Sequence, residues 1–237
     1  MSAHHKRVAI LISGRGSNMA ALIEAAKERD FPAEIVGVIS DKADAPGLHL
    51  ADTNDIATKV LLRSDFASKE AHDQAIDATL HVFGAELVCL AGYMRLLTDA
   101  FVDEWKGRMI NIHPVLLPLF KGLDTHRRAL EAGVRVHGCT VHFVTRQMDD
   151  GPIIAQAAVP VLSDDSEQRL AARVLKAEHR LYPLALRLVA EGKARMEGAG
   201  VAFSGFDDAN ANRSGTMFAP EPLQTDYDLE QLARFTP

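Results

Sequence analysis

The sequence predicts an α/β fold: a doubly wound, mostly parallel sheet with helices on both faces, followed by an antiparallel strand pair towards the carboxyl-terminal side. Three observations lead to this prediction. Short apolar runs alternate with amphipathic helical patterns through the first half of the chain, as in parallel sheets covered by helices. Two strand-like segments then follow each other across a turn, which favours an antiparallel pair. A long amphipathic pattern closes the domain.

The first half of the chain supplies the parallel part of the sheet. Most of its apolar runs lack polar alternation, which is typical of strands buried on both faces. The expected strands are Val8–Ile12, Glu34–Ser40, Thr58–Leu62, Leu87–Ala91 and Met109–Ile112. The expected helices between them are Met19–Lys27, Pro46–Asp55, Ser68–Phe83 and a short one near Phe101.

The second half begins with two strands, Val136–Thr145 and Ile153–Val161, joined by a turn-rich segment. A helix over Ser166–Gly192 follows, and Pro183 should kink it. We expect one domain over residues 1–197. From Gly198 onward Gly, Asp, Asn, Ser and Pro dominate, so residues 198–237 are expected to be a mobile or surface-draped tail. The apolar stripe of the long helix predicts these inward side chains: Leu170, Val174, Ala177, Leu181, Leu184 and Leu188.

Composition narrows the choice of partners. The 237 residues are 47% hydrophobic and 24% charged, which is typical of a globular protein. With a net charge of −6, the chain as a whole lacks the excess of positive charge that is typical of nucleic-acid-binding proteins. No apolar run approaches the roughly 18 residues that span a bilayer, so we expect no membrane partner. Cys89 and Cys139 lie in apolar runs and are expected to be buried reduced thiols, which favours the cytoplasm.

A glycine-rich turn, Gly14-Arg15-Gly16-Ser17-Asn18, follows the first strand and opens a helix. Glycines let backbone N–H groups approach an anion, and the helix N-terminus adds positive partial charge. Ser17 or Asn18 should also cap the helix. A plain tight turn is the alternative. A nicotinamide site is a second alternative. Met19 stands where the dinucleotide motif has its third glycine, which weakens this alternative. Asp41, after the second strand, stands where a ribose-binding acid would lie, which keeps it open.

Polar residues at a strand end suggest acid–base chemistry. Asn111 and His113 lie on one face of a strand that Pro114 ends, where open α/β sheets bind ligands. An amide N–H can hold an oxyanion and an imidazole can move a proton, while a later carboxylate, Asp149, could orient the imidazole. A structural histidine and an ordinary Asp-Gly turn are the alternatives. We find no metal-ligand pattern and expect no metal.

Four motifs in this order are similar to those of the phosphoribosylglycinamide formyltransferases, over roughly residues 6 to 196. The Asn-x-His-Pro and Asp-x-Gly-Pro pair is specific to folate-dependent formyl transfer, and the glycine-rich turn narrows the family. The resemblance implies a Rossmann-type amino-terminal half that binds a ribonucleotide and a carboxyl-terminal half for folate and catalysis. The motifs are Ser13–Asn18, Leu90–Arg95, Asn111–Pro114 with Leu116–Pro118, and Asp149–Ile154.

The resemblance also implies roles for individual residues. Gly16, Ser17 and Asn18 should bind the ribose phosphate, and Glu178 the glycinamide end of the substrate. A structural pairing of Glu178 with an arginine such as Arg173 is the alternative. The folate pocket should be formed by Leu90, Met94, Arg95, Leu96, Leu97 and the backbone of Val144, Thr145, Arg146, Gln147 and Met148.

The reaction that the resemblance implies is formyl transfer from 10-formyltetrahydrofolate, a co-substrate, to the amine of glycinamide ribonucleotide. Asn111 and protonated His113 would hold the oxyanion, and Asp149 would orient the imidazole or a water. The partners would be these small molecules, and the protein a monomer or weak homodimer. A formyltetrahydrofolate deformylase, a nicotinamide-dependent oxidoreductase and a phosphate-ligand binding module are the alternative functions.

Two positions depart from the family pattern. Asp124 stands where many members have a histidine, so a loop imidazole that could pair with Asp149 is missing. Leu175 occupies a helix position that is polar in some relatives, so no substrate contact is assigned there. How Asp149 is held in this chain is the question that the sequence leaves open.

Overall fold

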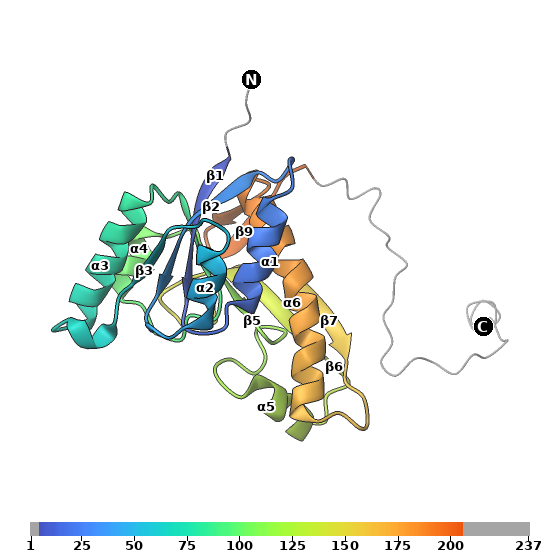
Figure 1. Ribbon diagram of the computed structural model, residues 1–237. Coiled ribbons are helices and arrows are strands. Elements are labelled where there is room, and N and C mark those ends of the chain that lie inside the picture. Colours follow the sequence, from blue (N-terminus) through green and yellow to red (C-terminus); the bar gives the residue numbers. More distant parts are fainter. Residues whose placement is uncertain (1–4, 206–237) are drawn as a thin grey trace, which may run out of the picture.

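A seven-stranded sheet forms the centre of the molecule in the computed structural model, which describes residues 5–205 (Figure 1). Its strand order is β3-β2-β1-β4-β5-β6-β7, parallel from β3 to β5 and antiparallel at β5–β6 and β6–β7. A separate hairpin joins β8 to β9. The strands are β1 (Lys6–Ile12), β2 (Ala33–Ser40), β3 (Thr58–Val60), β4 (Leu87–Leu90), β5 (Met109–His113), β6 (Val136–Phe143), β7 (Ile153–Pro160), β8 (Ala194–Glu197) and β9 (Gly200–Phe203).

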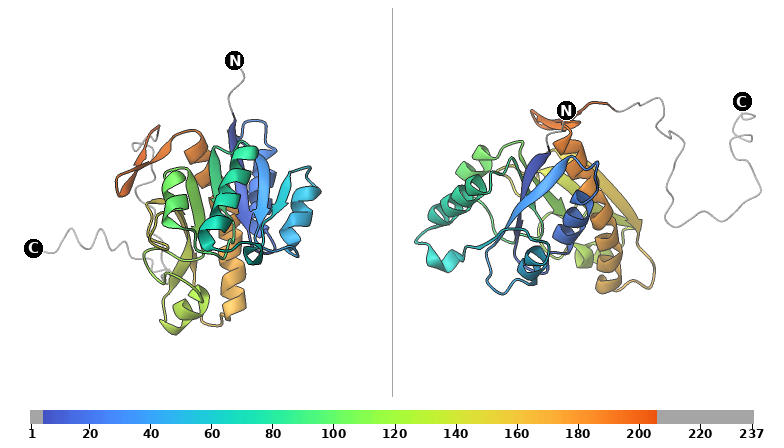
Figure 2. Two further views of the ribbon diagram at one scale, coloured as in Figure 1. Left: turned by 90° about the vertical axis from the view of Figure 1, so that its left-hand side faces the viewer. Right: turned by 45° about the horizontal axis from the view of Figure 1, so that its top comes forward.

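Helices cover both faces of the sheet (Figure 2). Val8, Ile10 and Ile12 of β1 belong to a core shared with α1, α2, α5 and α6, whereas Ala9 and Leu11 belong to a second core with α3 and α4. This alternation is the period-2 pattern of a strand buried on both sides. The helices are α1 (Ser17–Ala26), α2 (Pro46–Asp52), α3 (Lys69–Val82), α4 (Asp99–Glu104), α5 (Thr125–Glu131) and α6 (Glu167–Ala190), with a 3-10 turn at Arg63–Asp65.

The predicted fold class is confirmed, but three details of the prediction are wrong. Helix α5 was not expected. The hairpin β8–β9 continues regular structure to Phe203, past the expected domain end at residue 197. Leu184 is 50% exposed, because the face of α6 that meets the sheet carries Glu178 and Tyr182 instead. Residues 206–237 of the expected tail lie outside the described residues.

The core holds both cysteines as free, buried thiols, as predicted. Burial raises the pKa of each, Cys89 and Cys139, to about 12, so both stay protonated and unreactive at neutral pH. Within residues 5–205, no helix is long and apolar enough to cross a membrane.

The turn between β6 and β7 is held by a close backbone approach at Gly151. Phe143 N–H donates to the Pro152 carbonyl at 2.9 Å, and the two strands pair from Val136 to His142. A Cβ atom on Gly151 would lie 1.7 Å from the Phe143 carbonyl oxygen, which no side chain tolerates. Glycine is therefore required here by the packing of two backbones.

We predict that Gly151→Ala destabilises the protein by about 1–3 kcal/mol, because the new methyl group must push the turn away from β6. Urea unfolding followed by circular dichroism measures the change. Gly200→Ala is the matched control, since its nearest neighbour would be 3.8 Å away. Equal stability of the two variants would contradict the prediction.

Candidate active site

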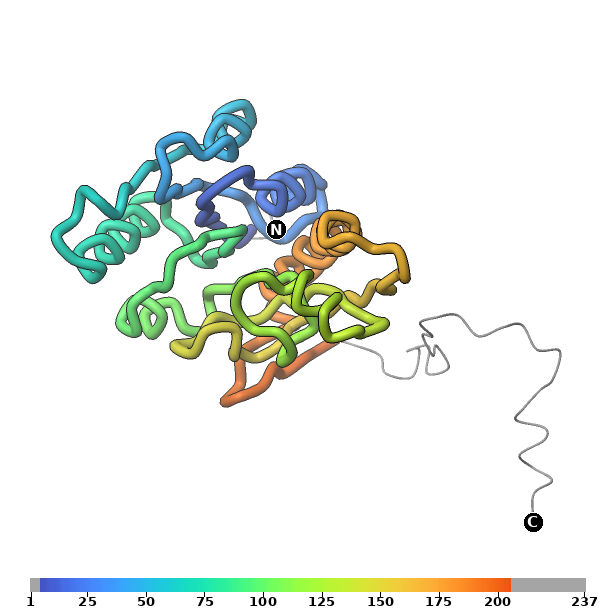
Figure 3. Tube along the Cα trace, turned by 90° about the horizontal axis from the view of Figure 1, so that it is seen from below, coloured from blue at the N-terminus to red at the C-terminus, as the bar shows by residue number. Residues whose placement is uncertain are grey.

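The glycine-rich turn, the Leu90–Leu97 segment and His113 lie at the edge of the sheet where the parallel strands end, the edge seen from below in Figure 3. Strand β1 runs into the glycine-rich turn, β4 into the Leu90–Leu97 segment and β5 into His113. Ser13 N–H donates to the Gly92 carbonyl at 3.2 Å and Met94 N–H donates to Ser13 Oγ at 2.9 Å, so two of these segments are tied together.

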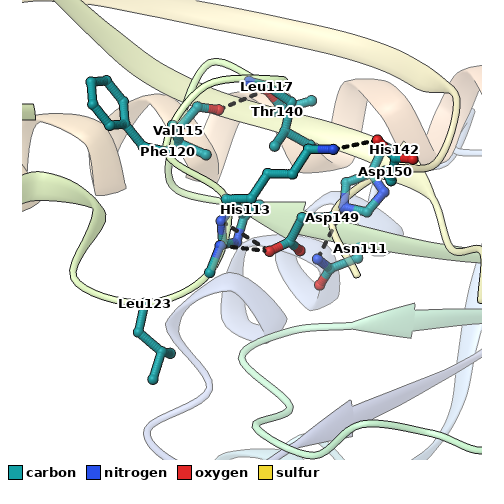
Figure 4. A network of polar contacts seen from close by, with 12 residues as sticks. Asn111, His113, Val115, Leu117, Phe120, Leu123, Thr140, His142, Asp149 and Asp150 are labelled. Carbon is teal, nitrogen blue, oxygen red and sulfur yellow. Dashed lines mark hydrogen bonds and ion pairs between the residues drawn. The ribbon is translucent and has the colours of Figure 1, made fainter. Parts of the chain in front are cut away.

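Asn111 and His113 share one face of β5, as predicted from the alternation. Ile110 and Ile112 point to the opposite face, into the core with α6. Because β6 is antiparallel to β5, His142 stands directly opposite Asn111. Asn111 Nδ2 lies 3.2 Å from His142 Nε2 (Figure 4). The sheet therefore presents a carboxamide between two imidazoles.

Asp149 comes to this cluster from the turn between β6 and β7, in a left-handed conformation (φ 51°). Its Oδ2 atom lies 3.3 Å from His113 Nε2, within ion-pair reach although not aligned as a hydrogen bond. The same oxygen accepts a hydrogen bond from Gly122 N–H at 3.0 Å. The side chains of His113 and Asp149 are 13% and 10% exposed, so their interaction is partly shielded from water.

Burial sets the protonation of both imidazoles. It lowers the pKa of His113 below its ordinary value, while the Asp149 carboxylate opposes this and His142 and His126 add to it. Burial also lowers the pKa of His142. Both rings are therefore neutral at pH 7, so His113 can accept a proton there and the charge formed would meet Asp149.

His142 is a site residue that the sequence did not reveal. Its place in an alternating strand was visible, but no local pattern indicated which residue of β5 it would face. Only the register of β6 against β5 puts His142, rather than its neighbours, opposite Asn111. His142 Nδ1 also lies 2.9 Å from the Phe143 carbonyl, which fixes the ring.

The glycine-rich turn has the form of an anion cradle. Gly16 is the N-cap of α1 in a left-handed conformation (φ 71°), without a side-chain hydrogen bond to the helix. The expectation that Ser17 or Asn18 caps the helix is therefore wrong, since both lie inside the first turn. The first N–H groups of α1 have no acceptor within the helix and remain for a ligand. A Cβ on Gly14 would meet no atom within 4 Å, so the turn borders open space.

Asn18 and Glu178 connect the turn to α6. Asn18 Nδ2 donates to Glu178 Oε2 at 2.8 Å, and Glu178 is 5% exposed. Burial raises the pKa of this carboxyl, and the Asn18 hydrogen bond only partly opposes it. The alternative pairing is excluded because Arg173 binds Asp165 instead. Glu178 is a costly buried acid with one amide partner, which favours a ligand role.

The two proposed folate segments flank β5 from both sides, since they follow β4 and β6. Leu90 is buried, whereas Met94 and Leu96 are 66% and 65% exposed and so form no part of the core. Apolar side chains left in solvent beside polar residues are typical of a ligand site. The second segment also borders a cavity of about 490 Å³, which residues 90–97 do not line. Its lining includes Val102, Asp103, Lys106, Val144, Thr145, Arg146, Gln147 and Met196.

Arg95 and Asp41 form an ion pair that removes the basis for a nicotinamide site. Arg95 Nε donates to Asp41 Oδ2 at 2.6 Å, and the Asp41 side chain is 2% exposed. The acid that could bind a ribose hydroxyl is thus buried and paired. This pair instead anchors the segment after β4 to the end of β2.

Comparisons with known proteins show the family of this chain. Residues 6–186 match the family model described as formyl transferase. The chain belongs to the formyl transferase family. It is 47% identical over 189 residues to phosphoribosylglycinamide formyltransferase of Escherichia coli, an alignment that covers 80% of this chain and 89% of that protein. It is also 50% identical over 194 residues to the trifunctional purine biosynthetic protein adenosine-3 of Gallus gallus.

That second alignment covers 82% of this chain but only 19% of the chicken protein's length. A crystal structure of phosphoribosylglycinamide formyltransferase from Brucella melitensis is 62% identical, with a TM-score of 0.76 over 78% of this chain and 96% of that one. A formyltetrahydrofolate deformylase from Pseudomonas syringae is a more distant neighbour. Its identity is 27% and its TM-score 0.79, over 85% of this chain and 67% of that one.

We predict that Glu178→Gln raises the free energy of unfolding at pH 8. The wild-type carboxyl has a raised pKa in the fold, so its ionised form costs stability above that pKa, and the cost fades as the pH falls towards the ordinary value of 4.5. Urea unfolding of the variant and the wild type between pH 4.5 and pH 8 should show a difference in the free energy of unfolding that disappears at the acid end. Glu197→Gln, at an exposed position, is the control. A difference in the free energy of unfolding that does not depend on pH would contradict the raised pKa of Glu178.

Proposed function

We propose that this chain transfers the formyl group of 10-formyltetrahydrofolate to the amine of glycinamide ribonucleotide, a step of purine synthesis. The observation that carries the proposal is the convergence of Asn111, His113 and Asp149 at the end of β5, at the same edge of the sheet as the anion cradle that follows β1. Membership of the formyl transferase family and the names of the most similar proteins support it. Reduced buried thiols fit a cytoplasmic enzyme.

The ribonucleotide binds at the glycine-rich turn. Backbone N–H groups of Gly16, Ser17 and Asn18 hold its phosphate at the N-terminus of α1. Glu178, held by Asn18, binds the amino end of the substrate. A substrate ammonium group next to Glu178 would favour ionisation of this buried carboxyl, so each group gains from the other.

The formyl folate binds between the segments after β4 and β6. Leu90, Leu96 and Leu97 supply apolar walls, and the backbone from Val144 to Met148 supplies hydrogen bonds for the polar edge of the ring. Arg95 keeps the first segment in place through Asp41.

The substrate ammonium group first loses one proton to solvent. The free amine then attacks the formyl carbon, which gives a tetrahedral intermediate. Asn111 Nδ2 donates to the oxyanion. Neutral His113 takes the proton that the amine loses, and the imidazolium, stabilised by Asp149, delivers it to the folate nitrogen as the carbon–nitrogen bond breaks. The protein holds two substrates together, which supplies much of the acceleration.

The deformylase is the rival within this chemistry, because water could replace the amine. Loss of formyl folate is measured with and without glycinamide ribonucleotide. Consumption that requires the ribonucleotide and yields its formylated form supports the transferase. Equal consumption without it, with release of formate, overturns the proposal.

We predict that His113→Ala lowers kcat about 10²–10⁴-fold, since the proton acceptor is lost. Asn111→Leu should lower kcat about 10²–10³-fold through loss of an oxyanion donor. Steady-state formyl transfer measures both. Near-normal turnover of His113→Ala in folded protein would show that the catalytic assignment is wrong.

We also predict an acid limb in the pH profile of kcat/KM, at an apparent pKa below the ordinary 6.5 of histidine. Burial and the neighbouring His142 and His126 lower the pKa of His113, and Asp149 raises it. Asp149→Asn should therefore move the limb to still lower pH while lowering kcat. A limb that moves to higher pH in this variant would contradict the pairing.

A further inference from the structure

Asp149 is held by a loop that is conformationally demanding. Three of the five residues from Phe120 to Asp124 have positive φ, namely Phe120 (49°), Gly122 (87°) and Asp124 (55°). Left-handed conformations cost free energy in residues other than glycine, so contacts from outside must hold this loop. The Gly122 N–H that reaches Asp149 is the loop's direct link to the catalytic cluster.

Arg128 of α5 supplies those contacts. Its Nη1 atom donates to the carbonyl of Lys121 at 2.6 Å and of Phe120 at 3.1 Å, and lies 3.4 Å from that of Leu123. Its guanidinium carbon also lies 5.7 Å from the centre of the Phe120 ring. The guanidinium thus binds the carbonyls on both sides of Gly122, which leaves the Gly122 N–H directed at Asp149.

The acidic residue of the loop does not compete for this guanidinium. Asp124 pairs with the neighbouring Arg127, on the exposed side of α5. Lys121 pairs with Asp150, which joins the loop to the turn that carries Asp149. Arg128 has its loop carbonyls as acceptors and lies half-buried beneath them.

We propose that Arg128 is a positioning residue for formyl transfer: it fixes the Phe120–Asp124 loop so that Gly122 N–H holds the Asp149 carboxylate beside His113. The proposal rests on the proposed function, because it assigns Arg128 a part in that reaction. A backbone N–H, held from behind by an arginine, therefore contacts the carboxylate that lies beside His113.

The test compares Arg128→Met with Arg127→Met, which removes an equal charge from the adjacent, exposed position. We expect Arg128→Met to lower kcat about 10–100-fold, as displaced catalytic groups do, with little change in the KM of either substrate. Arg127→Met should behave as the wild type. Arg128→Lys, which keeps one donor, should recover part of kcat.

The pH profile separates positioning from simple charge loss. Asp149, His142 and His126 are the titratable groups that act on His113. Removing a nearby positive charge alone would raise the pKa of His113, whereas misplacing Asp149 lowers it. We expect the acid limb of Arg128→Met to move to lower pH, towards that of Asp149→Asn. A move to higher pH, or none, overturns the proposal.

A double variant tests whether Arg128 acts through Asp149. If it does, adding Arg128→Met to Asp149→Asn should cost less than about twofold in kcat beyond the loss from Asp149→Asn alone. If the kcat losses of the two single variants multiply in the double variant, the proposal is wrong. It is also wrong if the kcat loss of Arg128→Met equals the fraction of that variant that urea unfolding shows to be unfolded. Absence of formyl transfer by the wild type would instead refute the proposed function.

Discussion

The antiparallel pairing of β5 with β6 is the constraint on which the site depends. It sets His142 opposite Asn111 and Thr140 opposite His113. Thr140 is fully buried; its hydroxyl donates to the Val115 carbonyl at 2.7 Å and accepts from Leu117 N–H at 3.0 Å (Figure 4). The chain that leaves His113 is therefore fastened to the neighbouring strand. Because β6 is antiparallel, the β6–β7 turn begins beside the start of β5, where Val144 N–H donates to the Met109 carbonyl at 2.9 Å, and the turn folds back to bring Asp149 to His113.

The titratable side chains of the candidate site share one property: they are buried without a partner that fully stabilises their charged form. His113 and His142 are kept neutral because the protein withholds water from their charged forms, and Glu178 is held at a raised pKa for the same reason. Each of these groups has a polar neighbour that partly opposes the shift. Such a balance leaves the groups ready to change charge when a substrate brings a proton or an ammonium group.

The sequence predicted the sheet well because the signals for it are local. Fully apolar runs, helical periodicity and turn residues fixed the strands before His113 to within a few residues. Where the local signal was weak, the prediction failed: α5 is short and follows a strained loop, and the β8–β9 hairpin gains its order from packing on the main domain. The apolar stripe of α6 predicted that Leu184 points inward, but Tyr182, whose hydroxyl donates to the Leu90 and Ile110 carbonyls, occupies that face.

By itself, the sequence determined the α/β class, the family motifs and the placement of Asn111 and His113 on one face, since a strand's period of two depends on nothing beyond the strand. Only the tertiary structure decided that His142 joins them, that Glu178 pairs with Asn18 rather than Arg173, and that Gly122 holds Asp149. These contacts join residues 27 to 160 positions apart. Their geometry follows from strand register and loop conformation, which the packing of the whole chain sets.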